Sequence, residues 1–173
     1  APRGEKIAQK TLNARLGILG GISILDTTGV VNPLSHAAYI ATIDAGLSVA
    51  RAAGLKQVLL TTGRRSERFA QNRWPQMADE SFIQMGDFFA KTVTLAADYG
   101  FDSILIAIFF GKAVKMAQGI EHTHARSARL TLKQLAQWAL EITSNQNLAN
   151  QIKTANTSRQ VFDWIKDDHP ALV

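Results

Sequence analysis

The side chains with the clearest capacity for chemistry in this sequence are two histidines separated by one residue, His122 and His124. Side chains two residues apart on an extended backbone point to the same side. The two imidazoles can therefore make paired polar contacts or relay a proton near neutral pH. As a metal pair they lack a third ligand, and the chain has no cysteine, so no metal site is expected. The alternative is a structural role, in which Thr123 caps the helix that follows.

A glycine and two lysines that precede the histidines predict a binding site for an anion. Gly111, Lys112 and Lys115 follow the apolar run of residues 103–110 and open a helical pattern. Glycine lets a ligand approach the backbone, and the N-terminus of a helix attracts negative charge. For each lysine taken alone, the alternative is an ordinary solvated surface charge.

Two further segments carry groups that suit polar ligands. Residues 26–29, Asp-Thr-Thr-Gly, present a carboxylate, two hydroxyls and backbone N–H groups, although the glycine pattern matches neither a phosphate-binding loop nor a dinucleotide fingerprint. Residues 63–78 contain four arginines, whose guanidinium groups can bind a carboxylate or phosphate through two hydrogen bonds. The alternatives are an ordinary turn for the first segment and a solvated loop for the second. The four arginines are Arg64, Arg65, Arg68 and Arg73.

The hydrophobic pattern predicts the elements that must position these segments. Helices are expected over 35–53, 79–100, 111–118, 125–143, 146–155 and 158–167, strands over 16–25, 57–62 and 103–110, and a polar loop over 64–78. Alternating strands and helices imply right-handed crossovers and a parallel sheet. We therefore expect the α/β class, with a mainly parallel sheet and flanking helices in a Rossmann-like α/β/α layering, and a helical C-terminal extension. Ligands gather beyond the carboxyl ends of such strands, which selects the loops 26–34, 63–78 and 111–124.

Composition excludes several classes of protein. Hydrophobic residues make up 46% and charged residues 19% of the 173 residues, which is typical of a globular chain and excludes disorder and collagen. No apolar run has the length of a membrane span, and no signal peptide is recognisable. The net charge of +5 is spread along the chain without interleaved aromatic residues, so neither a nucleic acid nor a membrane is expected as a partner. The lack of cysteine fits a cytoplasmic protein.

The domain organisation expected from the sequence is simple. A lead-in segment covers residues 1–15 and a single α/β domain covers 16–173, because no linker or repeat interrupts the pattern. The first residue is alanine rather than methionine, which predicts a piece of a longer protein. The sequence leaves the oligomeric state open, a homo-oligomer included.

Several motifs together resemble one family, the cobalt-precorrin-5B C1-methyltransferases or CbiD family. The longest matching block runs through residues 5–25, with Thr-Thr-Gly-Val-Val at 27–31 and Pro-Leu-Ser at 33–35. Further matches are Val-Leu-Leu-Thr at 58–61, Gly-Lys at 111–112 and His-Thr-His at 122–124. The resemblance spans nearly the whole chain but covers only the C-terminal part of the family. It therefore implies that the protein's own N-terminal domain, which is missing here, is a partner of this chain.

The resemblance implies S-adenosylmethionine-dependent methylation at C1 of cobalt-precorrin-5B, an anionic tetrapyrrole, in anaerobic cobalamin biosynthesis. Given that activity, we expect residues 26–29 and Gly63 to bind the methyl donor. His122 and His124 are expected to be catalytic, orienting the tetrapyrrole or accepting a proton, and cobalt enters only as part of the substrate. The residues expected to bind the donor are Asp26, Thr27, Thr28, Gly29 and Gly63. The residues expected to bind the carboxylated substrate are Arg64, Gly111, Lys112, Lys115, Thr123 and Arg126.

Four positions on the expected ligand-binding loops depart from the family pattern. Asp26 stands where the family usually has glycine, and Thr62 where it has proline. Arg64 replaces a usual asparagine, and Phe109 replaces a common histidine. These departures leave an alternative, a non-catalytic α/β ligand-binding or assembly module derived from the family. An RNA-binding module is a third reading, which a steep salt dependence of RNA affinity would support.

Overall fold

The computed structural model describes residues 3–11, 13, 18–21, 36–120 and 132–173. The chain divides into two compact units, Ala1–Ala107 and Ile108–Val173, and each is described by itself. Within the described ranges, none of the helices combines the length and the apolar character that crossing a membrane requires. The expectation of a lead-in over 1–15 and one domain over 16–173 stays a prediction.

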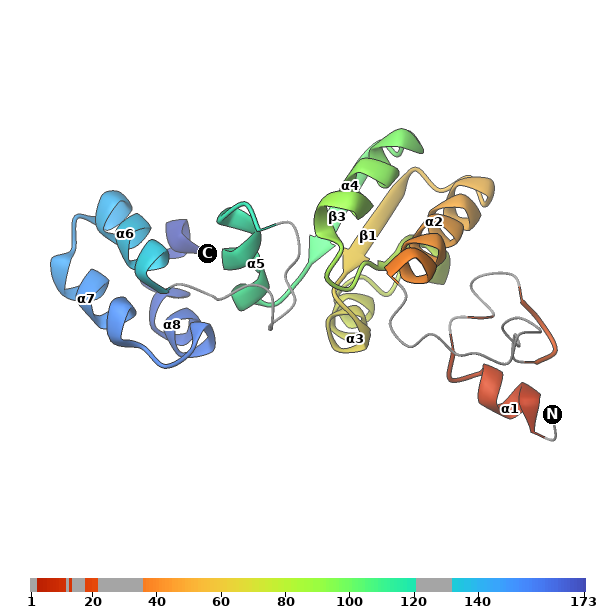
Figure 1. Ribbon diagram of the computed structural model, residues 1–173, viewed down its shortest axis with the longest axis horizontal. Helices are drawn as coiled ribbons and strands as arrows, with labels where there is room; N and C mark the ends of the chain where they lie inside the picture. Colours follow the sequence, from red (N-terminus) through yellow and green to blue (C-terminus); the bar gives the residue numbers. More distant parts are fainter. Residues whose placement is uncertain (1–2, 12, 14–17, 22–35, 121–131) are drawn as a thin grey trace. The chain divides into compact units, whose positions relative to one another are not determined.

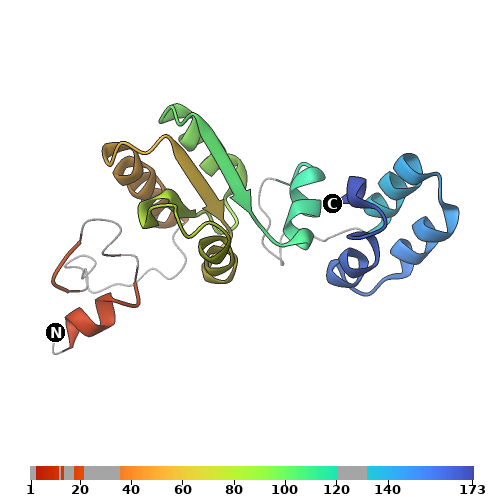
Figure 2. The same cartoon turned by 180° about the vertical axis from the view of Figure 1, so that it is seen from behind.

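The first unit is built on a parallel three-stranded sheet (Figure 1). The strands are β1 (Gln57–Thr61), β2 (Phe82–Gln84) and β3 (Ser103–Ala107), in the order β2-β1-β3. Thr61 pairs with Gln84 on one side and with Ala107 on the other, so the three strands end at one edge. Figure 2 shows β1 and β3 running side by side from behind. Residues 58–61 are fully buried, as expected for a central strand covered on both faces.

Helices cover both faces of this sheet. On one face, Ala70 of α3 (Arg64–Arg73) packs with Leu59 and Phe82 in a small apolar cluster. On the other face, α2 (His36–Ala52) packs against β2 and against α4 (Phe89–Asp98). The expected α/β class with a parallel sheet and flanking helices is therefore confirmed. The described residues of this unit also form a short helix α1 (Gly4–Ala8) and a 3-10 turn η2 (Asp79–Ser81).

Two segments of the first unit fold differently from the prediction. Residues 64–73 form helix α3 rather than the predicted loop. The hydrophobic pattern does not reveal this helix, because its buried face consists of Ser66, Glu67 and Ala70 and carries no apolar stripe. Residues 82–84 form strand β2 rather than the start of a helix. The spacing of Phe82 and Met85 imitates a helical period, but both lie in the core and Gly86 ends the extended segment.

The other elements expected in the first unit are confirmed in part. Helix α2 and strand β1 form where the sequence predicts them. Strand β3 ends at Ala107, three residues before the predicted end. The strand expected over 16–25 is absent from the described residues 18–21, and the rest of it lies outside the described residues.

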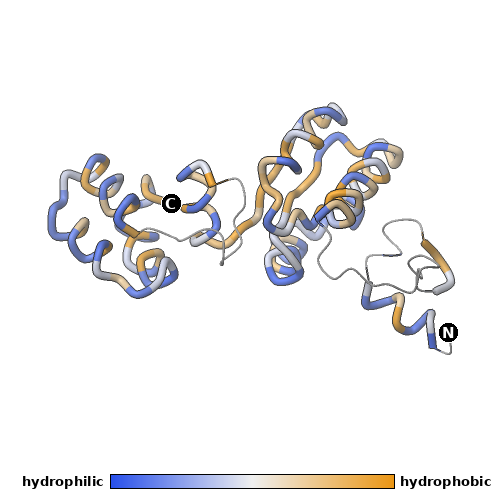
Figure 3. The backbone as a smooth tube through the Cα atoms, viewed as in Figure 1, coloured by the Kyte–Doolittle hydropathy of each residue, from blue (hydrophilic) through white to orange (hydrophobic). Residues whose placement is uncertain are grey.

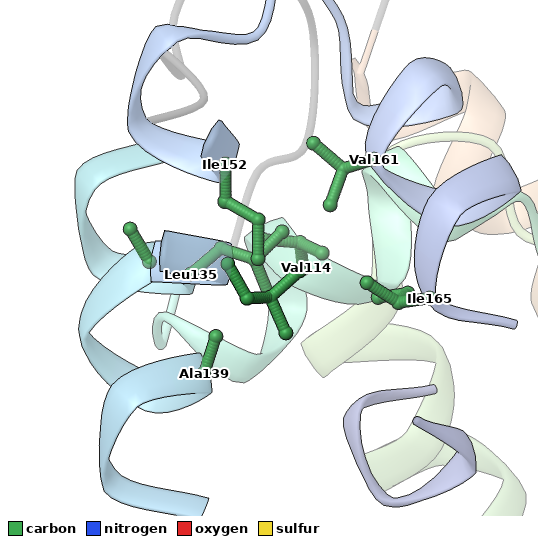
Figure 4. Close-up of a cluster of buried hydrophobic side chains, with 8 residues drawn as sticks. Val114, Leu135, Ala139, Ile152, Val161 and Ile165 are labelled. Carbon is green, nitrogen blue, oxygen red and sulfur yellow. The ribbon is translucent and has the colours of Figure 1, made fainter. Parts of the chain in front are cut away.

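The second unit is helical, as the predicted C-terminal extension requires. It contains α5 (Phe110–Ala117), α6 (Leu132–Thr143), α7 (Gln146–Thr154), α8 (Ser158–Ile165) and the 3-10 turn η3 (Pro170–Leu172). The helices alternate between hydrophilic and hydrophobic residues (Figure 3), and their apolar sides meet in one core (Figure 4). The core residues are Val114, Leu135, Ala136, Ala139, Leu148, Ile152, Val161 and Ile165.

Side-chain caps set the start of the last two helices. Asn145 Oδ1 accepts a hydrogen bond from the backbone N–H of Leu148 at 3.0 Å, at the start of α7. Thr157 Oγ1 accepts one from the N–H of Gln160 at 3.2 Å, at the start of α8. Each cap satisfies one of the backbone donors that the first turn of a helix leaves without a partner. The helices expected over 146–155 and 158–167 are therefore confirmed within two residues.

Candidate functional site

The site residues predicted from the sequence divide into two groups that the structure describes and a third that lies outside the described residues. Gly63 and Arg64 lie in the first unit, at the carboxyl end of β1. Gly111, Lys112 and Lys115 lie in the second unit, on α5. The remaining predictions lie outside the described residues, and they are Asp26, Thr27, Thr28, Gly29, His122, Thr123, His124 and Arg126.

The turn between β1 and α3 is a glycine turn closed by one serine. Gly63 has φ 148°, a conformation that glycine adopts readily and other residues rarely do. The Ser66 hydroxyl donates to the Gly63 carbonyl oxygen at 2.9 Å, and the Thr62 N–H donates to Ser66 Oγ at 3.0 Å. Apart from the chain neighbours of Gly63, no atom of the described residues lies within 4 Å of where a Cβ on Gly63 would stand. The backbone of this turn is thus fixed by its own contacts.

A buried carboxylate lies one turn into α3. The backbone N–H of Glu67 donates to the Gly63 carbonyl oxygen at 3.0 Å, and the residue is only 5% exposed. Its Oε2 accepts a hydrogen bond from Gln84 Nε2 at 2.8 Å. Gln84 is the last residue of β2, so this bond joins α3 to the carboxyl edge of the sheet. It fixes the carboxylate beside the edge where parallel sheets bind ligands.

Three aromatic side chains pack together at the turn that follows β2. The Tyr39 and Phe88 rings lie 5.3 Å apart between centroids, and His36 meets Phe88 edge-on at 5.2 Å. Gly86 has φ 58°, and a Cβ there would lie 2.7 Å from the Tyr39 hydroxyl oxygen. The first turn of α2 therefore packs directly against the β2–α4 turn.

Two nearby carboxylates make the electrostatic potential at the Tyr39 hydroxyl negative. Partial burial raises the pKa of Tyr39 above its ordinary value of 10.0, and the charges of Asp87 and Glu67 raise it further. The Tyr39 side chain is still 38% exposed. The field of both carboxylates therefore reaches a group that solvent can also reach.

The exposed Arg64 side chain is directed to the N-terminal segment of the same unit. Its guanidinium donates to the Lys10 carbonyl oxygen at 3.2 Å. The four arginines of the predicted loop lie on α3 instead. The contact between Arg64 and a substrate carboxylate stays a prediction.

The second predicted group lies on helix α5. Val114 anchors this helix in the core of the second unit, and the Phe110 and Phe162 rings lie 5.4 Å apart between centroids. A Cβ on Gly111 would lie 2.5 Å from Ser158 Oγ, so the starts of α5 and α8 are in close contact. Lys112 and Lys115 are both half-buried on α5. Gly111 and Lys112 thus lie in the first turn of α5 and Lys115 lies in its last turn, while their contact with a substrate stays a prediction.

The sequence reasoning missed three residues of the first unit that the structure brings together. Tyr39, Glu67 and Gln84 come from α2, α3 and β2. A helical reading of residues 64–73 would have placed Ser66, Glu67 and Ala70 on one side, because they are one and four residues apart. No comparable signal in the sequence points to Gln84. Across the described ranges, no group of three or more His, Cys, Asp or Glu could hold a metal ion.

Comparison with known proteins identifies the family. Residues 1–33 match the family model described as CbiD, and residues 122–173 match the model of the CbiD C-terminal domain. The cobalt-precorrin-5B C(1)-methyltransferase of Nitratidesulfovibrio vulgaris is 48% identical over 99% of this chain. The chain belongs to the CbiD family. The resemblance expected from the sequence is therefore confirmed.

Other CbiD relatives with the same name are similar over comparable lengths. The Priestia megaterium protein is 46% identical over 94% of the chain, and the Geobacter sulfurreducens protein is 41% identical over 99%. The chain spans slightly less than half of these relatives, covering 45%, 44% and 48% of the three proteins in turn. No solved structure matches the chain.

Proposed function

We propose that this chain is part of a methyltransferase that uses S-adenosylmethionine to methylate C1 of cobalt-precorrin-5B in cobalamin biosynthesis. The observation that carries the proposal is the 48% identity over 99% of the chain with a relative of that name. Because the chain covers only 45% of that relative, the activity is proposed for the longer protein, with its N-terminal domain as partner. A biosynthetic enzyme that draws on the cellular methyl donor works in the cytoplasm, and we propose that location.

The chemistry requires alignment of two ligands. S-adenosylmethionine supplies a methyl group to a carbon nucleophile, and the cobalt belongs to the substrate. The protein contributes by holding donor and acceptor in line, which lowers the entropic part of the barrier. The β1–α3 turn at Gly63 lies at the carboxyl edge of a parallel sheet, which is where such sheets bind ligands, and this position supports the proposal. We propose that Gly63 and residues 26–29 surround the donor.

The roles proposed for the other residues follow from their charge. The tetrapyrrole carries several carboxylates, and an ammonium or guanidinium group binds a carboxylate through charge-assisted hydrogen bonds. Lys112 in the first turn of α5 and Lys115 in its last turn are proposed as such groups, and Gly111 is proposed to contact the substrate beside them. Arg64, Thr123 and Arg126 are also proposed to contact the substrate. His122 and His124 are proposed to orient the tetrapyrrole or to accept the proton released at the methylated carbon.

The test uses the full-length protein with cobalt-precorrin-5B and S-adenosylmethionine that carries a labelled methyl group. The expected result is transfer of one methyl group to C1, detected by mass spectrometry and by nuclear magnetic resonance of the product. S-adenosylhomocysteine should inhibit the transfer. Donor binding without transfer would favour the non-catalytic module instead, and absence of both donor binding and transfer would reject the proposal.

A further inference from the structure

The carboxyl edge of the first unit contains a charged group that the proposed roles leave unexplained. Glu67 is the only buried charged side chain within the described residues, at 5% exposure. Taking a carboxylate out of water costs free energy, which hydrogen bonds and favourable charges must offset. Its position in the first turn of α3 and its bond from Gln84 contribute to that stabilisation. A hydrophobic residue at this position would avoid the cost altogether.

The location of the carboxylate indicates the ligand that it serves. In the order β2-β1-β3, the connection from β1 leads to α3 on one face of the sheet and the connection from β2 leads to α4 on the other. Diverging connections open a crevice at the carboxyl edge of a doubly wound sheet, where ligands bind. Glu67 and Gln84 lie at that divergence, between the glycine turns at Gly63 and Gly86.

A negative charge at this edge of the sheet would discriminate between the two ligands of the proposed reaction. The carboxylate groups of the tetrapyrrole would be repelled by Glu67, whereas S-adenosylmethionine carries a positive sulfonium and a positive ammonium group. S-adenosylhomocysteine, the product, keeps the ammonium but has a neutral sulfur. A fixed negative charge near the sulfur therefore favours the donor over the product and assists their exchange.

We infer that Glu67 is a specificity-determining residue that favours the cationic methyl donor over the neutral-sulfur product, and that Gln84 is the residue that positions it. The inference rests on the proposed function, because it assumes a sulfonium donor. The hydrogen bond of 2.8 Å from Gln84 Nε2 to Glu67 Oε2 holds the carboxylate beside the end of β2. Burial, Asp87 and Glu67 together raise the pKa of the partly exposed Tyr39, so the charge of Glu67 also reaches a group at the surface of the first unit.

The test measures dissociation constants of the full-length protein for S-adenosylmethionine and S-adenosylhomocysteine by calorimetry. Glu67→Gln, which keeps the shape and can still bond to Gln84, should weaken donor binding about tenfold, in line with the loss of a charged interaction. Product binding should change less than about threefold by the same reasoning, so the preference for the donor falls. Asp98→Asn, an exposed carboxylate of α4, is the matched control and should leave both constants unchanged.

A second variant separates positioning from folding. Gln84→Ala keeps the charge of Glu67 but removes the bond that orients it, so it should lower the donor preference in the same direction by a smaller factor. A purely structural role would instead lower the melting temperature and weaken both ligands equally, which would overturn the inference. An unchanged preference in folded Glu67→Gln would also overturn it. If Glu67→Gln does not fold, the preference measured for Gln84→Ala decides.

The same titrations separate this inference from the function on which it rests. Methyl transfer by the wild-type protein together with an unchanged ligand preference in the variants would reject the role of Glu67 alone. A wild-type protein that neither binds the donor nor transfers a methyl group would reject the proposed function, and the inference with it.

Discussion

The Tyr39 ring lies directly on Gly86, with no room for a side chain between them. A Cβ at position 86 would be 2.7 Å from the Tyr39 hydroxyl oxygen and 2.9 Å from the ring carbon that bears it. Gly86 also has φ 58°, in the left-handed region that other residues rarely adopt. The turn after β2 therefore depends on glycine both for its conformation and for the contact with α2.

Gly86→Ala should lower the free energy of unfolding by about 2–4 kcal/mol, because left-handed strain and overpacking add. Gly54→Ala is the matched control, since Gly54 has φ 75° but, apart from its chain neighbours, no described residue has an atom within 4 Å of its Cβ position. The control should lose only about 1 kcal/mol, from backbone strain. Chemical denaturation of both variants measures the difference. Equal losses would mean that Tyr39 moves aside at no cost.

The two tyrosines of the chain allow the charge around Tyr39 to be measured directly. The variant Tyr99→Phe leaves Tyr39 as the sole phenol, and its midpoint should lie above the ordinary pKa of 10.0. Adding Glu67→Gln should lower that midpoint, because one of the charges that raise the pKa is removed. The absorbance of tyrosinate during an alkaline titration gives both values. The same protein in denaturant supplies the ordinary pKa of the phenol. A midpoint that does not change when Glu67→Gln is added would contradict the influence of Glu67 on Tyr39.

The raised pKa of Tyr39 also predicts how stability depends on pH. The folded protein holds the phenol proton more tightly than the unfolded chain does, so this contribution to stability is complete below pH 10.0. It is lost as the pH rises through the folded pKa. In the Tyr99→Phe background, adding Tyr39→Phe should therefore reduce the alkaline decline in the free energy of unfolding. Denaturant titrations of both proteins on either side of pH 10.0 measure this decline, and an identical decline would contradict the prediction.

The sequence predicted the elements whose signals are local. The β1 strand is a compact apolar run, and the second unit carries clear caps at Asn145 and Thr157. The prediction from the sequence failed where tertiary contacts override the local pattern. Helix α3 buries Ser66 and Glu67, which a hydrophobic period cannot detect, and β2 is only three residues long.

The candidate site shows the same division. The place of Gly111 and Lys112 at the start of a helix could be predicted, because the junction after the apolar run of residues 103–110 is visible in the sequence. Their role in binding stays a prediction. The contact between Glu67 and Gln84 joins residues that are 17 positions apart, and it depends on the register of β2 beside β1. No spacing rule for a single helix or strand predicts such a pair, so only the folded structure reveals it.

Close contact between the starts of α5 and α8 predicts coupling between Gly111 and Ser158. Alanine at position 111 gains helix propensity, worth about 1 kcal/mol over glycine, but its Cβ would lie 2.5 Å from Ser158 Oγ. Gly111→Ala should therefore stabilise the Ser158→Ala variant more than it stabilises the wild type, by about 1 kcal/mol. A double-mutant cycle of unfolding free energies measures this coupling. Strict additivity would show that the serine rotates away freely.

The start of α5 also predicts how the substrate is bound. Lys112→Ala in the full-length protein should weaken binding of the tetrapyrrole about tenfold, because a charge-assisted bond to a carboxylate is lost. The affinity of the variant should also fall less steeply with added salt, since one ionic contact is missing. Absorbance titration of the tetrapyrrole at several salt concentrations gives both quantities.

Lys133→Ala is the control for this experiment, because Lys133 is an exposed lysine of α6 in the same unit. It removes the same charge from the protein as a whole but not from the start of α5, so its affinity and salt dependence should match the wild type. Equal effects of the two variants would show that substrate binding responds to net charge alone. A Lys112→Ala variant that unfolds would assign the lysine a structural role, because its aliphatic part is half-buried on α5. Retained melting temperature with weakened binding is the expected combination, since Val114 anchors α5 in the core independently of Lys112.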